Sequence, residues 1–485
     1  MGTAATGYGI AAYGTYLPAH RLSLAEIGAT LGTNAGKGTR VVASFDEDST
    51  TMGVVAAARA LAVSGSEPSG TPPHPDPTVP IDGAKLPPSA RRHPSAVYFA
   101  TTSPAYADKT NATAIHAALD LPESVFVADL AGSARSGIAA LRAAARSSGL
   151  AILADVRVGR PGSADERGGG DGAAAFLFGG DPIAEIIAES SCTAEFLDRW
   201  RDPASVTGSQ WEERFGVEQY QPLIDRAVAA ALAQAGIAEA DHVVLISPNS
   251  AVAKRAAHQV TGKLSTRTSV IGHAGAADVG VALAAVLDIA EPGETVFVMS
   301  AADGCDAFVL RTTDRIVEGR QSIPVSAQLA AGHPVSYATY LGWRGILDRE
   351  PPRRPEPDRV AAPPSARAAR WKFSFTGSRC TACRLVHLPP ARVCKRCGSR
   401  DSMTDVSMAH RQATVATFTV DRLAFSLAPP VVEAVVDFAG GGRYTLEVAD
   451  GAADRLAVGS RVETTFRRLH SAGGVHNYFW KARLI

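Results

Sequence analysis

Residues 129–141, Asp-Leu-Ala-Gly-Ser-Ala-Arg-Ser-Gly-Ile-Ala-Ala-Leu, decide how the first part of this chain folds. The apolar run 125–128 before them predicts a short buried strand, and small apolar residues recur at helical spacing after them. A strand, a tight turn and a helix N-terminus place one side chain in a pocket beside free backbone N–H groups. Enzymes that transfer acyl groups hold their nucleophile in such a turn. Here the turn offers only Ser133, Ala134 and Ser136.

The composition indicates a soluble protein of several domains. A length of 485 residues suits roughly three domains or lobes. The 48 basic and 48 acidic residues give no net charge to attract nucleic acid or an anionic membrane, so we expect neither as a partner. The sequence shows no secretory signal and no apolar run of about twenty residues, so we expect a cytoplasmic protein.

The central turn resembles the nucleophile turn of the thiolase superfamily, most closely that of hydroxymethylglutaryl-CoA (HMG-CoA) synthases, which are related to 3-oxoacyl-ACP synthase III. In that family the acyl-accepting Cys precedes a run x-x-Gly-Thr-Ala-Ala. Residues 137–140, Gly-Ile-Ala-Ala, match this run, and the match puts Ala134 at the Cys position. Another register would leave Ser133 or Ser136 as a substitute nucleophile. The string Asp-Glu-Asp-Ser-Thr-Thr-Met at 46–52 is also similar to archaeal-type HMG-CoA synthases.

The resemblance places two further catalytic positions of the family on residues that cannot do the same work. The general acid/base Glu falls on Thr102, whose hydroxyl cannot take a proton from a carbon acid as a carboxylate can. The catalytic His falls on Ile246, or on Pro248 in a shifted frame. Where the family has Ile-Gly-Asn, with the Asn facing the acyl group, this chain has Ile-Gly-His, so that His273 takes the Asn position.

Several polar residues are candidates for the missing chemistry. Asp303 lies in a segment that resembles the family's Gly-Ser-Gly loop beside the active site. We therefore predict that His273 and Asp303 face one cavity, where the carboxylate would orient the imidazole. Tyr106 is a further candidate for proton transfer, and Ser133 with the N–H groups around Ala134 is a candidate for binding the thioester oxygen.

Two basic residues are candidates for binding coenzyme A. Lys254 and Arg255 lie on a helix expected after the strand 243–247, and the phosphates of CoA are their predicted ligands. A solvated helix surface is the alternative interpretation of both side chains.

Four cysteines near the C-terminus form the strongest single motif in the chain. Cys380 and Cys383 make one C-x-x-C pair, and Cys394 and Cys397 make a second. Four thiolates at this spacing suit a structural, tetrahedral Zn²⁺ with no open position. A redox dithiol and an iron–sulfur site are the alternatives. The cluster also argues against a secreted disulfide framework.

Five strand-like segments follow the cysteines and predict a small closed barrel of the OB type; they are 413–420, 431–438, 443–448, 461–467 and 478–484. Together with the cysteine motif they resemble the acyl-CoA-associated zinc-ribbon/OB-fold family. Members of that family commonly accompany thiolase-like enzymes as partner subunits, so this module could dock a partner enzyme. An OB fold that binds nucleic acid is the alternative, which the balanced charge disfavours.

These observations predict a five-layered, thiolase-like α/β fold of two pseudo-duplicated halves, followed by a zinc ribbon and an OB-fold barrel. The expected boundaries are 1–178 and 179–345 for the halves, 346–370 for a linker, 371–402 for the zinc ribbon and 403–485 for the barrel. The resemblance also implies a homodimer formed through the thiolase-like domain.

The expected function is that of an enzyme acting on an acyl-CoA or acyl-carrier thioester, a lyase or a transferase. It would form or cleave a C–C bond by aldol, retro-aldol or Claisen-type enolate chemistry without a Cys acyl-enzyme. One alternative is a catalytically inactive, HMG-CoA synthase-like scaffold that binds acyl-CoA. The other is an HMG-CoA synthase or ketosynthase that uses a substitute nucleophile.

Overall fold

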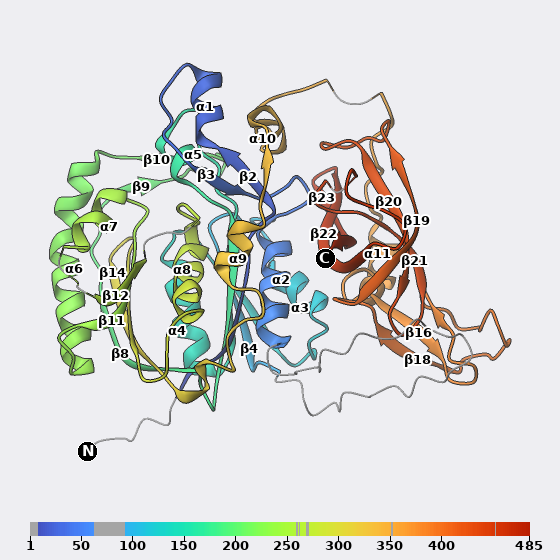
Figure 1. Cartoon of the computed structure of the whole chain (residues 1–485), viewed down its shortest axis with the longest axis horizontal. Helices are drawn as coiled ribbons and strands as arrows, with labels where there is room; N and C mark the ends of the chain where they lie inside the picture. The colour runs from blue at the N-terminus through green and yellow to red at the C-terminus, as the bar shows by residue number, and fades with distance from the viewer. Residues whose placement is uncertain are drawn as a thin grey trace. The chain divides into compact units, whose positions relative to one another are not determined.

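The computed structural model describes residues 8–62, 93–258, 260, 262–267, 271–350, 353–451 and 453–485 (Figure 1). Contacts between residues divide the chain into two compact units, which are described separately. Among the described residues, unit 1 holds 8–62, 93–115 and 122–347, and unit 2 holds 116–121 and the residues from 348 onward.

Ten strands form the framework of unit 1, in the order β12-β11-β13-β14-β8-β1-β7-β6-β4-β5. Their bounds are β1 Gly9–Tyr16, β4 Ala96–Thr101, β5 Phe126–Ala131, β6 Leu150–Asp155, β7 Gly172–Gly179, β8 Ala184–Cys192, β11 Ala240–Ile246, β12 Gly262–Arg267, β13 Thr295–Ala301 and β14 Cys305–Thr312. Each half of the sheet has five strands: β1, β4, β5, β6 and β7 in the first half, and β8, β11, β12, β13 and β14 in the second. When the five strands of a half are numbered 1 to 5 along the chain, both halves have the order 3-2-4-5-1 from their outer edge. Antiparallel pairing of β1 with β8 joins the halves. This repeated topology confirms the predicted duplication.

Helices lie outside and between the two halves of the sheet (Figure 1). Helix α2 (Ser49–Ala62) covers β1, β6 and β7, and α6 (Glu213–Ala235) covers β8 and β14. Helices α4 (Ser136–Ser147) and α8 (Asp278–Leu287) contact each other, and α8 contacts strands of both halves. The result is the five-layered arrangement of helices and sheets that the sequence predicts.

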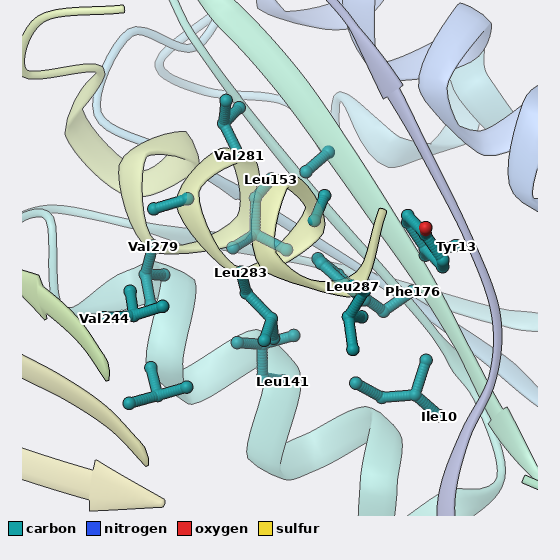
Figure 2. Packing of buried hydrophobic residues seen from close by; sticks show 14 of the residues in the cluster. Ile10, Tyr13, Leu141, Leu153, Phe176, Val244, Val279, Val281, Leu283 and Leu287 are labelled. Atoms are coloured by element: carbon teal, nitrogen blue, oxygen red, sulfur yellow. The ribbon is translucent and has the colours of Figure 1, made fainter. Parts of the chain in front are cut away.

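Helix α8 is the centre of the hydrophobic core. Its sequence, Asp-Val-Gly-Val-Ala-Leu-Ala-Ala-Val-Leu, is apolar on all sides after the first residue, as expected for a helix enclosed by other elements. Figure 2 shows Leu283 and Leu287 of this helix beside Leu141 of α4, with Phe176 of β7 and Val244 of β11 from the two half-sheets.

Shorter elements of unit 1 are β2 His20–Ser23, α1 Leu24–Leu31, β3 Thr39–Val42, α5 Ala164–Gly168, β9 Arg199–Trp200, β10 Ser209–Gln210, α7 Ser250–Ala256, α9 Val325–Ala330, β15 His333–Val335 and α10 Tyr337–Trp343. Helix α3 (Ala112–Ala118) begins in unit 1 and ends in unit 2. None of the helices in the described parts of the chain combines the length and the apolar character that crossing a membrane requires.

Strand β5 differs from its prediction. The apolar run before the central turn predicts a buried strand, but β5 lies at the end of the strand order and, among the described strands, pairs only with β4. Its first residue, Phe126, is 62% exposed. The prediction is wrong because a central strand and an edge strand can share the same short apolar pattern.

From residue 353 onward, the described part of unit 2 contains two β-sheets and two short helices. Helices α11 (Ala362–Arg367) and α12 (Ala369–Lys372) occupy part of the expected linker. A three-stranded sheet has the order β17-β16-β18, and a five-stranded sheet has the order β21-β20-β19-β22-β23. The bounds are β16 Thr376–Cys380, β17 Val386–His387, β18 Met403–Ser407, β19 Gln412–Asp421, β20 Val431–Phe438, β21 Arg443–Glu447, β22 Arg461–Ala472 and β23 Val475–Leu484.

The five-stranded sheet follows the five segments expected for an OB fold. A parallel bridge between Val448 and Ala482 connects the end of β21 to β23 and so joins the two edge strands. The interior is aromatic: Phe375 and Trp480 stack with ring centroids 6.2 Å apart, and the Trp480 indole N–H donates to the Phe373 carbonyl at 2.8 Å. Both strand order and core fit a small β-barrel.

Candidate functional site

The central turn has the predicted form of strand, turn and helix. Strand β5 ends at Ala131, Gly132 has φ +139°, and α4 begins at Ser136. A φ in this range is strained for any residue with a side chain, so the turn requires glycine there. Ala134 follows within the turn and offers no nucleophilic atom.

The polar groups of this turn are engaged within it. The N–H of Arg135 donates to Ser133 Oγ at 3.3 Å, the N–H of Ser136 to the Ser133 carbonyl at 3.0 Å, and the N–H of Gly137 to the Ala134 carbonyl at 3.2 Å. The expectation that N–H groups around Ala134 bind a thioester oxygen is therefore not met for these three donors. Ser133 acts in the structure as a turn-stabilising hydroxyl.

Arg135 fastens the turn to the second half of the sheet. Its Nε donates to Asp306 Oδ2 at 2.8 Å, its Nη1 to the Asp303 carbonyl at 2.7 Å, and its Nη2 to Thr193 Oγ1 at 2.8 Å. The hydrogen bond that Arg135 donates to Asp306 is the main reason that the pKa of Arg135 is raised. Ser133, Arg135 and Asp306 also line a cavity of ≈ 430 Å³ against the turn.

Asp303 does not pair with His273 in the structure. Its backbone has φ +49°, its N–H donates to the Tyr220 hydroxyl at 3.1 Å, and its carbonyl accepts from Arg135. These contacts fix the loop and leave the Asp303 side chain exposed. The carboxylate partner of His273 is instead Asp278, whose Oδ2 lies 3.0 Å from His273 Nδ1.

His273 and Asp278 line a second cavity, of ≈ 370 Å³. Its walls come from the end of β11 with residues 245–250, from α7, from the loop 168–169 and from the Arg157 side chain. Two of the positions that the family resemblance singles out, Ile246 and Pro248, lie in this wall. Ala134, Thr102, Tyr106 and Asp303 are not among its lining residues.

The backbone around His273 is held tightly. His273 N–H donates to the Gly168 carbonyl at 2.6 Å, and Gly170 N–H donates to the His273 carbonyl at 3.2 Å. Gly272 has φ +89°, and a Cβ there would lie 2.6 Å from the Gly169 carbonyl oxygen, so only glycine allows this close approach. The imidazole therefore has a defined position in the cavity wall.

Asp278 fixes the orientation of this imidazole. It is the first residue of α8, and its side chain is 3% exposed against 16% for His273. Bonding of Nδ1 to Asp278 leaves Nε2 as the nitrogen available to a ligand. Asp278 Oδ1 is buried and has no hydrogen-bond partner among the described residues. Sequence reasoning missed Asp278, although a buried acid at the start of an apolar helix was a usable signal.

Thr102 is held by a buried carboxylate and a cation. Its hydroxyl donates to Asp155 Oδ1 at 3.1 Å and accepts from Arg157 Nη1 at 2.9 Å. Asp155 Oδ1 also accepts from Thr101 Oγ1 at 3.0 Å and Ser103 Oγ at 2.7 Å. Asp155 is fully buried and thus organises the loop after β4. Thr102 is a structural hydroxyl in this network, and sequence reasoning found neither Asp155 nor Arg157.

The remaining predicted site residues, Tyr106, Lys254 and Arg255, do not lie together in one cavity. Tyr106 lies in the loop after β4, where its N–H donates to Asn111 Oδ1 at 3.0 Å. Lys254 lines the cavity of His273. Arg255, its neighbour on α7, points elsewhere, because its Nε donates to Gln221 Oε1 at 3.2 Å.

The four cysteines of unit 2 come together as predicted. Their sulfur atoms lie within 4.8 Å of one another, with 3.7 Å between Cys380 and Cys397 and 3.4 Å between Cys383 and Cys394. A tetrahedral Zn²⁺ with Zn–S bonds near 2.3 Å places its sulfurs roughly 3.8 Å apart, so the donor set fits zinc. With all four positions taken by thiolates, such an ion would support the fold and leave no position for a substrate.

Comparisons with known proteins match the first and the last part of the chain to different families. Residues 373–402 match the family described as ChsH2, rubredoxin-like zinc ribbon domain, and residues 407–467 match ChsH2, C-terminal OB-fold domain. The HMG-CoA synthase of Archaeoglobus fulgidus is 29% identical over 359 residues, covering 69% of this chain and 98% of the relative. That of Methanothermobacter thermautotrophicus is 29% identical over 364 residues, covering 70% and 99%.

Solved structures show the same fold for the first part of the chain. An HMG-CoA synthase complexed with CoA matches with a TM-score of 0.56 and 16% identity over 69% of this chain and 89% of that one. PksG, an HMG-CoA synthase from Bacillus subtilis, matches with a TM-score of 0.56 and 18% identity over 70% and 89%. The chain therefore joins an HMG-CoA synthase-like domain of thiolase-like fold to a C-terminal zinc ribbon and OB-fold domain of the ChsH2 type.

Proposed function

We propose that this protein acts on an acyl thioester of coenzyme A, or of an acyl carrier, and forms or cleaves a C–C bond beside the thioester without an acyl-enzyme. Relatives named HMG-CoA synthase support the thioester chemistry. One similar solved structure is a complex with CoA, and another is a complex with a holo donor acyl carrier protein.

The observation that carries the proposal is the pair formed by His273 and Asp278 in a cavity of ≈ 370 Å³. A buried carboxylate that orients an imidazole is the arrangement of a general acid/base. The central turn has Ala134 where the family resemblance places an acyl-accepting Cys. The chain therefore has a group to move protons in this cavity, and Ala134 in the central turn cannot carry an acyl group.

This arrangement suits retro-aldol cleavage of a 3-hydroxyacyl thioester. His273 Nε2 takes the proton of the 3-hydroxyl group, and the bond between C2 and C3 breaks. Its electron pair forms the thioester enolate, while C3 becomes the carbonyl carbon of an aldehyde or ketone. His273 then returns the proton to C2, so the products are a shorter acyl thioester and a carbonyl compound. Aldol addition is the reverse sequence.

Lys254 is the proposed contact for a CoA phosphate. It is exposed and lines the same cavity as His273, whereas Arg255 faces Gln221. A thioester whose acyl end reaches His273 would then carry its phosphates near Lys254. The matched pair Lys254→Gln and Arg255→Gln tests this, because only the first should weaken CoA binding.

The proposal is tested by the products formed from a panel of 3-hydroxyacyl-CoAs, and from acyl-CoAs with aldehydes. We expect cleaved or newly joined products with the wild type and a loss of about 10²-fold or more in His273→Ala. Turnover that is unaffected by His273→Ala would contradict the assigned role.

A non-catalytic scaffold that binds acyl-CoA is the second candidate. Ala134 and Thr102 favour it, because neither supports the acyl transfer of the related synthases. Tight binding of CoA thioesters with no product from any member of the panel would establish this function in place of the first.

The assembly of the protein is proposed on similar grounds. In the described part of the chain no further strand follows β5 in the sheet, and Phe126 on β5 is exposed; a homodimer that covers this edge fits the resemblance to thiolases. The ribbon and barrel, with structural zinc on the four cysteines, are the proposed docking module for a partner enzyme.

A further inference from the structure

Ser247 places a buried hydroxyl in the wall of the cavity that His273 and Asp278 line. It follows Ile246, the last residue of β11, and is 9% exposed. Its Oγ accepts a hydrogen bond from the N–H of Asn249 at 3.2 Å. Among the described residues, no acceptor takes the proton of this hydroxyl. Ser247 therefore keeps one hydrogen-bond donor for a group inside the cavity.

Asn249 fixes the position of this hydroxyl. The Oδ1 atom of Asn249 caps helix α7 by accepting the N–H groups of Ala251 and Val252. Its Nδ2 donates to Asp198 Oδ1 at 3.4 Å, so the side chain is held from both sides. The N–H group that Ser247 accepts thus belongs to a residue with a defined place. A donor that is in place before the ligand arrives needs no reorganisation during the reaction.

Ser250 supplies the other hydroxyl of the cavity lining. Its Oγ donates to Glu213 Oε1 at 3.4 Å, and the residue is exposed. The proton of Ser250 is therefore engaged by a carboxylate, whereas that of Ser247 is not. This difference makes Ser250 a matched control for Ser247.

The proposed chemistry requires such a donor. An enolate carries negative charge on the former thioester oxygen, and enzymes stabilise this charge with fixed hydrogen-bond donors in a site shielded from water. The backbone N–H groups of residues 135–137, in the central turn, are occupied within that turn. An enolate formed at His273 must therefore find its donor in the cavity itself.

A role of Ser247 as a nucleophile has no support in the described contacts. A serine hydroxyl needs an adjacent base to become nucleophilic. The printed partner of His273 is Asp278, and no hydrogen bond in the described part of the chain joins His273 to Ser247. A neutral hydroxyl suits hydrogen-bond donation to an oxygen.

We propose that the Ser247 hydroxyl donates a hydrogen bond to the thioester carbonyl oxygen and stabilises the enolate formed there. This inference rests on the proposed function, because it assumes that the thioester reaches the cavity of His273. Ser247 is then a second catalytic residue: His273 moves the proton, and Ser247 holds the oxygen that gains the charge. No bond to Ser247 forms or breaks.

The first test measures kcat and KM for Ser247→Ala, Ser247→Thr and the control Ser250→Ala on the best substrate of the panel. Loss of one such donor costs about 10²- to 10³-fold in kcat, and we expect this loss in Ser247→Ala with KM within about threefold of the wild type. Ser247→Thr keeps the hydroxyl and should restore most of kcat. Ser250→Ala should retain kcat within about threefold, because its proton is already used. Thermal unfolding establishes that each variant is folded.

A second test requires no turnover. Acetyl-CoA with a ¹³C-labelled carbonyl is bound to each protein, and its carbonyl stretch is measured by infrared difference spectroscopy. A hydrogen bond to the oxygen polarises the carbonyl, so the stretch should fall in frequency on the wild type and on Ser250→Ala. It should return toward the value of free acetyl-CoA on Ser247→Ala. Ser247→Cys, whose thiol is a weak donor, gives the same comparison if Ser247→Ala does not fold.

A normal kcat in Ser247→Ala, or a carbonyl frequency that is the same with and without the hydroxyl, overturns the proposal. An acyl adduct on Ser247 also overturns it, because the residue would then be a nucleophile. If Ser247→Ala and the wild type convert the substrate equally well, the inference fails and the proposed function stands. If the wild type neither binds nor converts any thioester, the proposed function fails as well.

Discussion

Replacing Asp278 by Asn removes the charge that orients His273 and keeps the size of the side chain. The side chain is 3% exposed, and its Oδ2 lies 3.0 Å from His273 Nδ1. A hydrogen bond to a charged group contributes about 1.5–3 kcal/mol, and each 1.4 kcal/mol in the barrier changes the rate tenfold. We therefore expect kcat to fall by about 10- to 150-fold in Asp278→Asn.

The matched control is Asp303→Asn, which changes the carboxylate that the sequence predicts as the partner. Its side chain is exposed, and the described contacts of residue 303 with Tyr220 and Arg135 use only its backbone. We expect kcat within about twofold of the wild type.

Both variants are assayed for kcat and KM on the best substrate of the panel, and their thermal unfolding is compared with that of the wild type. Thermal midpoints close to the wild-type value establish that a rate loss arises in the site. A normal kcat in Asp278→Asn, or an equal loss in Asp303→Asn, would refute the assignment of the pair.

Three further predictions concern other parts of the chain. Burial raises the pKa of Cys305 to about 12. Because the thiolate is the reactive form, Cys305 should resist alkylation at pH 8 in the folded protein and should react once urea unfolds the chain. Peptide mass spectrometry measures the labelling, and rapid labelling of the folded protein would contradict this prediction. Cys383→Ser should abolish the binding of one zinc per chain and lower the unfolding temperature of unit 2, because structural zinc contributes folding free energy on the order of 10 kcal/mol in small domains. Metal analysis and calorimetry test this prediction. An unchanged zinc content would refute zinc binding by the four cysteines. Phe126→Lys should shift the protein from dimer to monomer in light scattering, because it places a charge on the exposed edge of the sheet; a dimer that persists would show that another surface forms the interface.

Much of the fold could be predicted from local patterns. The strand–turn–helix at 126–147 follows from an apolar run, small turn residues and helical periodicity. The zinc cluster follows from the spacing of its cysteines, which fixes the ligands whatever surrounds them. The five strands of the barrel follow from alternating apolar residues between Gly-rich turns. These features are encoded within short stretches of sequence.

The site could be predicted only in part, because its geometry depends on contacts between distant elements. The sequence predicts His273 as a site residue from its position, but the resemblance of one loop predicts Asp303 as its partner, where the structure has Asp278. The φ of +49° at Asp303, together with its backbone bonds to Tyr220 and Arg135, fixes that loop in a way no local pattern reveals. The partnership of His273 with Asp278 also becomes visible only when the loop before α8 is folded.

The most direct measurement is the exchange of hydrogen at C2 of an acyl-CoA in D₂O, followed by mass spectrometry of both the thioester and the intact protein. The account predicts that deuterium enters the acyl group, that His273→Ala abolishes this exchange, and that the mass of the protein does not change. An acyl-sized increase in protein mass would contradict a mechanism without an acyl-enzyme. The absence of exchange for every thioester that binds would contradict enolate chemistry in this cavity.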